Sequence, residues 1–191
     1  MENEKKIQII RAASKRFARH SLFKTTLDEI ARDLRISKAS LYYYFESKDQ
    51  LFYETVRWDG DQFVEEIKSI FNNESLQIFE RFSRYFALKD EVQSNHKLLF
   101  DLILKAAGDN INEKEIELYK FFLQKEEQII KLALSPVYAG RIETMNPELP
   151  SFVVMTSWGL MFGNKLRNIE PREKSAHTSD MIQKTLQVLF G

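Results

Sequence analysis

The chain of 191 residues is long enough for one or two domains with a buried core, and its 28 Lys and Arg balance 28 Asp and Glu. It has no cysteine, which excludes disulfide frameworks and thiolate zinc sites. The charge is uneven, because residues 1–48 hold eleven basic and six acidic residues while the rest hold 17 and 22. A basic amino-terminal segment on a mildly acidic body favours a nucleic-acid-binding head, although a locally basic solvated face would give the same count.

The first segment is charged and amphipathic, and it predicts a helix. Ile7, Ile10, Ala13 and Phe17 form one apolar stripe at helical spacing. The start carries no secretory signal pattern, and the longest apolar stretch, residues 152–162, is too short to cross a bilayer. We therefore expect a soluble cytoplasmic protein.

Three helix starts follow one another closely after this first helix. Thr26 with Glu29 forms a capping-box pattern, and Ser47 with Gln50 repeats it. Between them, Ser37 is a favourable N-cap, so the helix that it opens must be short. Two compact helices joined by a tight turn predict a helix-turn-helix, whose second helix reads DNA. The buried side of this crossing is expected to comprise Ile30, Leu34, Ile36, Leu41 and Phe45, with the small Ala31 at the closest approach.

The outer face of the short helix is polar, basic and aromatic, which suits a DNA groove. Its three successive tyrosines cannot form one core patch, because neighbouring residues on a helix point about 100° apart. Side chains at helix starts can reach phosphate, and those on the outer face can reach base edges. The candidate DNA-binding residues are Thr26, Ser37, Lys38, Ala39, Ser40, Tyr42, Tyr43, Tyr44 and Lys48.

The pattern T-(x)3-I-A-(x)5-S-(x)3-L-Y-x-(H/Y)-F-(x)2-K-(x)2-L resembles the N-terminal module of the TetR (tetracycline-repressor-like) family of bacterial regulators. With an upstream helix that also fits, the resemblance covers roughly residues 7–53, and matched positions at fixed spacing make it specific. It implies that Tyr42 contacts backbone phosphate while packing partly inside. The matching positions are Thr26, Ile30, Ala31, Ser37, Leu41, Tyr42, Tyr44, Phe45, Lys48 and Leu51.

Two glycines of that family pattern are missing. The family usually has glycine between its first and second helices, where this chain has residues 20–23, and again in the turn, where it has Arg35. A residue other than glycine in a left-handed conformation carries strain. The local geometry of these two places is therefore the part of the module that the resemblance leaves open.

Beyond the motif the periodicity stays helical, without strand alternation or internal repeats. We expect a connecting helix over residues 47–71 and further helices near 75–88, 94–107, 112–134, 150–168 and 175–190. The chain is thus predicted to be all-α with about nine helices. A three-helix DNA-binding domain would occupy residues 1–46, and a helical regulatory and dimerisation domain would occupy residues 47–191.

The body is rich in phenylalanine, since eleven of the 15 Phe follow residue 58. Aromatic stripes at helical spacing belong to a core about as often as to a pocket, but the resemblance implies a small effector, hydrophobic or aromatic, among the middle helices. The candidate ligand-binding residues are Phe82, Phe86, Phe100, Leu104, Tyr119, Phe122, Trp158 and Phe162. No cofactor, metal site or catalytic set is expected, and His20, His96 and His177 lack ligand spacing, which predicts surface or boundary positions.

Gly159 and Gly163 lie one turn apart in a predicted helix, where each costs about 1 kcal/mol relative to alanine. Such a cost is tolerated where a second backbone comes close, or the glycines serve packing inside one chain. The resemblance implies that the last two helices form a four-helix bundle across a two-fold axis. The candidate dimer residues are Val153, Ser157, Gly159, Leu160, Gly163, Asn164, Met181, Thr185, Val188 and Leu189.

Together these features predict a homodimeric transcriptional regulator, a repressor that a small molecule releases from a palindromic DNA operator. The chain is not expected to be an enzyme or to bind a membrane. Two alternatives remain open, a small-molecule-binding protein with a vestigial helix-turn-helix and a DNA binder without ligand control.

Overall fold

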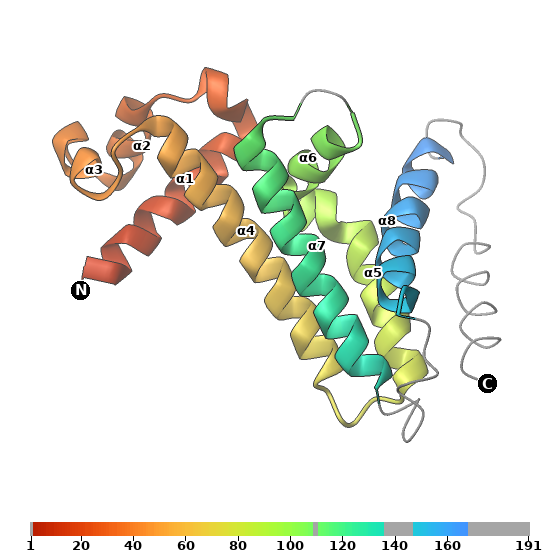
Figure 1. Cartoon of the computed structure of the whole chain (residues 1–191). Helices are drawn as coiled ribbons and strands as arrows, with labels where there is room; N and C mark the ends of the chain where they lie inside the picture. Colours follow the sequence, from red (N-terminus) through yellow and green to blue (C-terminus); the bar gives the residue numbers. More distant parts are fainter. Residues whose placement is uncertain (1, 109–110, 136–146, 168–191) are drawn as a thin grey trace. The chain divides into compact units, whose positions relative to one another are not determined.

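A computed structural model describes residues 2–108, 111–135 and 147–167 of the chain. Within these ranges the chain is all-α, as predicted, with eight helices and no strand (Figure 1). The helix expected over residues 175–190 lies outside the described residues. The helices are α1 (Glu2–Lys24), α2 (Leu27–Leu34), α3 (Lys38–Tyr44), α4 (Lys48–Phe71), α5 (Ile78–Asn95), α6 (Lys97–Ala106), α7 (Glu113–Leu134) and α8 (Leu149–Arg167).

The starts of α2 and α3 agree with the sequence patterns because local capping bonds set them. The Thr26 hydroxyl accepts the Glu29 amide at 3.3 Å, and the Glu29 carboxylate accepts the Thr26 amide at 2.9 Å. The Ser37 hydroxyl accepts the amide of Ser40 at 3.1 Å and opens α3. Both helices therefore begin where a side chain satisfies amides that the helix itself leaves unpaired.

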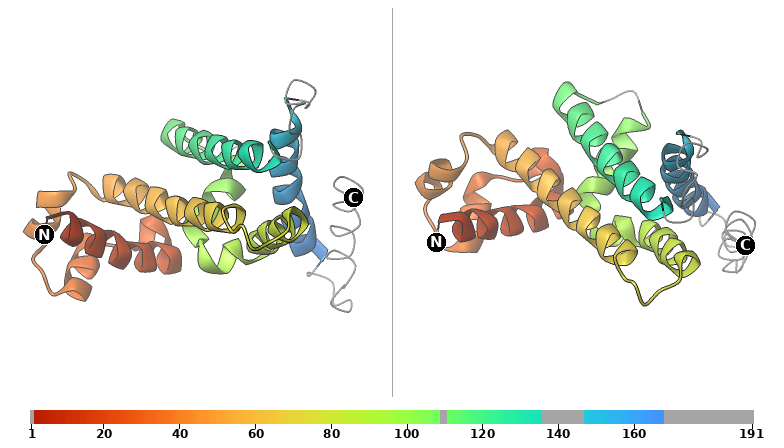
Figure 2. Two further views of the ribbon diagram at one scale, coloured as in Figure 1. Left: turned by 90° about the horizontal axis from the view of Figure 1, so that it is seen from below. Right: turned by 60° about the horizontal axis from the view of Figure 1, so that its bottom comes forward.

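Helix α4 also begins as predicted and runs as one unbroken helix (Figure 2). The Ser47 hydroxyl accepts the Gln50 amide at 3.0 Å, which makes Ser47 its cap. The reciprocal bond of the predicted capping box is different, because the Gln50 side chain accepts from the amide of Glu46 at 2.6 Å.

Helix α5 begins later and ends later than the predicted range of 75–88. It begins later because the Asn73 side-chain oxygen accepts both the amide and the hydroxyl of Ser75, at 3.1 and 2.6 Å, which forms a turn there. It continues past residue 88 because its buried face recurs at helical spacing for another two turns. The buried residues of that face are Phe82, Tyr85, Lys89 and Val92.

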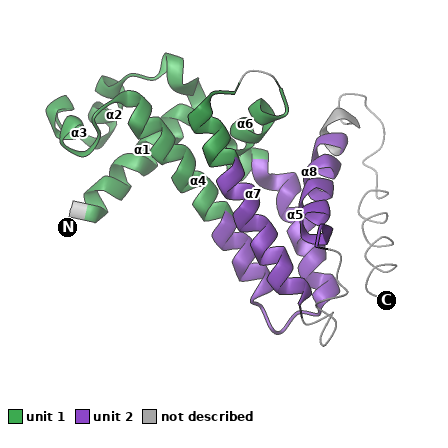
Figure 3. Cartoon of the chain, viewed as in Figure 1, with its two compact units in different colours: residues 1–63, 93–119 green, residues 64–92, 120–191 purple. Residues whose placement is uncertain are grey.

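The chain forms two compact units (Figure 3). Unit 1 comprises residues 1–63 and 93–119, and unit 2 comprises residues 64–92 and 120–191. Each unit has an apolar core of its own. Leu34 and Ile36, predicted in the core of the helix-turn-helix, are only partly buried. The buried residues of α1, of the helix-turn-helix and of the start of α4 include Ile9, Ala13, Phe17, Ile30, Ala31, Leu41, Phe45 and Leu51.

Helices α4 and α6 are joined within unit 1 through Asp59. The buried Asp59 carboxylate accepts the amides of Leu98 and Leu99, each at 3.0 Å, and so caps α6 from another helix. His96 lies beside it, in an edge-to-face contact with Phe63 and with its Nδ1 atom 3.2 Å from the Asp59 carbonyl oxygen. The prediction of a surface or boundary position is therefore wrong for His96, which is buried because it fills the junction of these helices.

Unit 2 has a polar cluster inside its aromatic core. Phe71 and Phe82 pack edge to face at 5.0 Å, and Phe82 also contacts Tyr85. The Tyr85 hydroxyl donates to the Glu126 carboxylate at 2.7 Å, and the indole N–H of Trp158 donates to it at 3.0 Å. These interactions satisfy a carboxylate that would otherwise be expensive to bury.

In the part of the chain that the structure describes, no helix combines the length and the apolar character needed to cross a bilayer.

Candidate nucleic-acid interface

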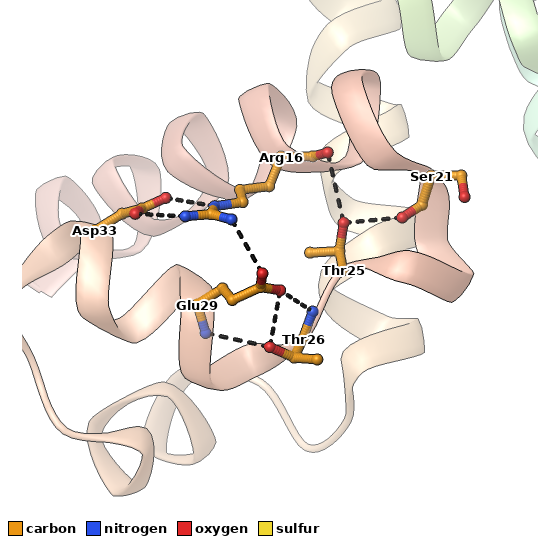
Figure 4. Close-up of polar contacts among 6 residues, drawn as sticks. All are labelled: Arg16, Ser21, Thr25, Thr26, Glu29 and Asp33. Atoms are coloured by element: carbon orange, nitrogen blue, oxygen red, sulfur yellow. Dashed lines mark hydrogen bonds and ion pairs between the residues drawn. The ribbon is translucent and has the colours of Figure 1, made fainter.

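An arginine on α1 fixes α2 in place (Figure 4). The guanidinium of Arg16 binds the Asp33 carboxylate at both oxygens, at 2.6 and 2.7 Å, and reaches Glu29 at 3.3 Å. Hydrogen bonding to Asp33 raises the pKa of Arg16, and the same bond lowers the pKa of Asp33. Bonds from Thr26 lower the pKa of Glu29. These ionised groups hold the first helix of the motif by a two-pronged contact, the strongest geometry available to arginine.

The segment between α1 and α2 is held by Thr25, which is buried. Its hydroxyl lies 2.8 Å from the carbonyl oxygen of Ser21 and 3.4 Å from that of Arg16 (Figure 4). Ser21 lies within the bounds of α1 and kinks it, with φ 64° and ψ 169°, a region occupied almost only by glycine. The chain therefore takes a glycine-like backbone at one of the two places where the family pattern has glycine, and it does so with serine.

Arg35 occupies the other such place and is also left-handed, with φ 53° and ψ 42°. Its amide bonds back to the carbonyl oxygens of Ala31 and Arg32, which ends α2. This confirms the turn predicted between α2 and α3. Since Arg35 is exposed, its side chain offers no packing that would offset the strain.

Helix α3 presents a lysine that is already paired. The Lys38 ammonium lies 2.8 Å from the Asp28 carboxylate in the first turn of α2. The hydrogen bond with Asp28 raises the pKa of Lys38, so Lys38 stays positively charged. Asp28 was not among the predicted site residues, and its negative charge beside Lys38 would weaken the attraction of this lysine for phosphate.

The three tyrosines of α3 differ in exposure, as expected for successive residues of a helix. Tyr42 and Tyr43 are exposed, by 50 and 73%, and Tyr44 is partly buried with its ring edge to face against Tyr43 at 5.0 Å. Leu41, the residue before Tyr42 in α3, is buried. Ala39 is exposed on the same short helix.

Two serines, Ser37 before α3 and Ser40 within it, stabilise the start of this helix. The hydroxyl groups of Ser37 and Ser40 lie 2.8 Å apart, and Ser37 also caps the helix. Thr26, exposed at the start of α2, is likewise engaged with Glu29. The predicted contacts of these three hydroxyls with DNA stay predictions, since each already has a partner within the module.

Lys48 lies at the first residue of α4 and bonds to the segment before α2. Its ammonium donates to the carbonyl oxygens of Leu22 at 3.0 Å and Thr25 at 3.3 Å. Lys48 is separated from these residues by more than twenty positions, so local patterns could not reveal the contact. Local patterns could not reveal the contact of Arg16 with Asp33 either, because these residues lie 17 positions apart.

The predicted ligand-binding residues are divided between the two units. Phe100, Leu104 and Tyr119 belong to unit 1, and the other five belong to unit 2. Leu104 is exposed, whereas Phe82, Phe100, Phe122 and Trp158 are buried, and Phe86, Tyr119 and Phe162 are partly buried. A ligand site at these residues stays a prediction.

The predicted dimer residues on α8 fall on different faces. Gly159 and Gly163 are exposed, Leu160 is partly buried, and Val153 and Ser157 are buried in unit 2. There the Ser157 hydroxyl lies 2.9 Å from that of Tyr85 and donates to the Val154 carbonyl at 2.7 Å. The Asn164 side chain and Met181, Thr185, Val188 and Leu189 lie outside the described residues, and the dimer stays a prediction.

Comparison with known proteins gives the same module. Residues 9–55 match the family model for bacterial regulatory proteins of the tetR family. The chain is 26% identical to the HTH-type transcriptional regulator YerO of Bacillus subtilis over 98% of the chain and 66% of YerO. It is 27% identical to the biofilm operon negative regulator IcaR of Staphylococcus aureus, over 65% of the chain and 54% of IcaR.

The fold is also shared with a solved regulator. The structure of FadR from Bacillus subtilis in complex with stearoyl-CoA superposes with a TM-score of 0.62, at 16% identity, over 97% of each chain. At that identity the similarity concerns the fold alone.

Proposed function

Because the chain belongs to the TetR family of bacterial regulatory proteins, we propose that it is a homodimeric DNA-binding repressor that a small molecule releases from its operator. The observation that carries the DNA-binding part is the two-sided α3. Its Leu41 side is buried in the head, while Lys38, Ala39, Tyr42 and Tyr43 face outward. Two such helices, one from each protomer, would enter successive major grooves about 34 Å apart on a near-palindromic site.

The charge distribution supports the same proposal. The excess of basic residues is confined to residues 1–48, which contain α1, α2 and α3. Contacts with phosphate supply most of the affinity of such proteins and fix their register on the duplex. Lys48 would provide one of these contacts, because its ammonium has three donors and two of them are used by Leu22 and Thr25.

The repressor and ligand parts rest on the relatives. IcaR is described as a negative regulator, and FadR was solved with stearoyl-CoA bound. The chain spans 66% of YerO and 54% of IcaR. A ligand would act by binding more tightly to the dimer when its two DNA-binding domains have one spacing than when they have another. The connecting helix α4 would couple the ligand site to that spacing.

The homodimer is supported by an exposed apolar stripe on α8. Phe152 and Met155 are exposed by 63 and 53%, and Gly159 and Gly163 continue the same side of the helix. No described atom outside the helix backbone lies within 4 Å of a Cβ built on either glycine. The described part of one chain therefore does not require glycine at these positions.

The deciding experiment is a gel shift with DNA fragments from the region upstream of the protein's own gene, repeated at several salt concentrations. We expect one retarded band whose affinity falls steeply with salt. Absence of sequence-selective binding would favour the small-molecule carrier with a vestigial helix-turn-helix. Selective binding that no ligand relieves would favour the DNA binder without ligand control.

A further inference from the structure

Unit 1 contains a cavity of about 220 Å³ whose lining reaches Phe23, four residues before α2 begins. Residues from the end of α1, from α4, from α6 and from the start of α7 line it, and none of the eight predicted ligand-binding residues is among them. Most of the lining is apolar. Its apolar side chains include Phe17, Phe52, Val56, Leu98, Leu102 and Leu118.

The polar groups of the lining are paired with one another. The Lys105 ammonium lies 2.7 Å from the Glu115 carboxylate, which also accepts the amide of Asn112 at 3.1 Å. The Asn112 side chain donates to the Tyr53 hydroxyl at 3.1 Å. Asp101 is paired outside the cavity with Lys97. Since every charge has an opposite charge beside it, a charged ligand would have to displace an existing pair, and a neutral ligand would not.

The volume limits the ligand to a compact molecule. An apolar cavity of roughly 150 Å³ binds benzene, so one of about 220 Å³ has room for two fused rings. A single hydroxyl or ring N–H on such a molecule could meet Tyr53 or Asn112 at the polar side. Phe23, which is 91% exposed, belongs to the lining, so solvent reaches the cavity there.

We propose that this cavity is an effector site for neutral, bicyclic aromatic molecules with one hydrogen-bonding group, and that its occupation weakens DNA binding. The proposal rests on the proposed function, because its second half requires that the chain bind DNA. All residues that line the cavity belong to unit 1, whereas Phe82 and Trp158 are buried in the aromatic core of unit 2.

The connection to DNA binding runs through the segment that carries α2. Ser21, Leu22 and Phe23 line the cavity. The backbone of the same segment is held by Lys48 at Leu22 and by Thr25 at Ser21, immediately before α2 begins. A ligand that pushes on the Leu22 side chain therefore acts on the backbone to which the helix-turn-helix is attached.

Ser21, in the same segment, has a strained backbone conformation. At φ 64° and ψ 169° it occupies a region that residues other than glycine rarely adopt. A ligand that binds better when this residue relaxes would shift the population of head positions and lower the fraction competent to bind the operator.

The first test is a calorimetric titration of the full-length protein with 2-naphthol in the absence of DNA. We expect one site per chain with a dissociation constant of tens of micromolar. Leu118→Trp places a large ring in the cavity and should weaken binding at least tenfold, and Leu102→Phe provides a second filling variant if Leu118→Trp does not fold. The matched control is Glu117→Trp, since Glu117 is exposed on α7 beside Leu118 and does not line the cavity.

Absence of 2-naphthol binding, or equal binding by the wild type and a folded filling variant, would overturn the site. The second test repeats the gel shift with 2-naphthol present, and we expect operator affinity of the wild type to fall at least fivefold while that of the filling variant does not change. Binding without any effect on operator affinity would overturn the regulatory half. If the protein binds no DNA at all, the proposed function fails, whereas the titration still decides the site.

Discussion

The ammonium nitrogen of Lys48 lies 3.0 Å from the carbonyl oxygen of Leu22 and donates a hydrogen bond to it. A second bond, 3.3 Å long, joins it to the carbonyl oxygen of Thr25. The first residue of α4 thus holds the segment before α2 and keeps its third donor for another acceptor. A DNA phosphate near the amino terminus of α4 is the partner that this arrangement favours.

Lys48→Ala should weaken binding to all DNA sequences by the same factor and reduce the salt slope by about one unit, as expected for one lost phosphate contact. The measurement is the operator affinity at several salt concentrations, for specific and for unrelated DNA. Lys68→Ala is the control, because Lys68 lies in the last turn of the same helix. An unchanged slope together with an altered base preference would show that Lys48 does not contact the DNA backbone.

Tyr43→Ala should change which operator bases are preferred. Tyr43 is the most exposed tyrosine of α3, where a ring or hydroxyl can reach a base edge. We expect discrimination to fall by roughly 1–3 kcal/mol at one position of each half-site. Selection of binding sites from a random DNA pool measures this directly. If the mutant selects the wild-type consensus, Tyr43 does not read bases.

Replacing the two strained residues by glycine should stabilise the head. Ser21 and Arg35 are exposed residues with positive φ, a conformation that glycine adopts without steric cost. Arg35→Gly should raise the free energy of unfolding by about 1 kcal/mol. It removes the strain of the left-handed conformation, and the greater freedom of glycine in the unfolded chain offsets part of that gain. Urea unfolding measures it, with Arg35→Ala as the control that keeps the strain. A less stable Arg35→Gly variant would mean that the arginine side chain makes a stabilising contact.

These examples show how far the sequence determines the fold. The starts of α2, α3 and α4 are predicted to within a residue because each depends on a cap three residues away, such as Thr26 with Glu29. The contacts of Arg16 with Asp33 and of Asp59 with the start of α6 join residues far apart in the chain. No local pattern contains such contacts, which is also why the lining of the cavity could not be predicted.

The buried pair of Lys89 and Glu126 predicts a test of unit 2. The Lys89 ammonium is paired with the Glu126 carboxylate and lies 3.6 Å from the centre of the Trp158 ring. Lys89→Met should cost about 3–5 kcal/mol, because it leaves a buried carboxylate without its cation. The double variant Lys89→Met with Glu126→Gln should recover most of that loss, since buried ion pairs are replaceable by neutral groups of similar volume. Urea unfolding of both single variants and of the double variant completes the double-mutant cycle. If the two single losses in the free energy of unfolding simply add in the double variant, the pair is not coupled.

The same lysine predicts a dependence of stability on pH. Burial lowers the pKa of Lys89 from 10.5 to about 8, so the unfolded chain binds more protons than the folded one between these values. The free energy of unfolding should therefore rise from pH 8 toward pH 10, by roughly 2 kcal/mol. Above pH 10 the trend should reverse, because burial raises the pKa of Tyr85 and the unfolded tyrosine loses its proton first. Lys89→Met should abolish the rise, and a rise of equal size in that variant would assign it to another group.

Gly159→Leu or Gly163→Leu should convert the proposed dimer into a monomer. A side chain at either position meets no described atom of its own chain, so the change should not disturb unit 2 and should even favour the helix by about 1 kcal/mol. If two copies of α8 meet at these glycines, the leucine side chain keeps their backbones apart. Operator affinity should then collapse, because a single head gives only the weak binding of one module. Sedimentation at micromolar concentration measures the shift, and Gly108→Leu is the control at a glycine in unit 1. A variant that stays dimeric with normal operator affinity would place the dimer surface elsewhere.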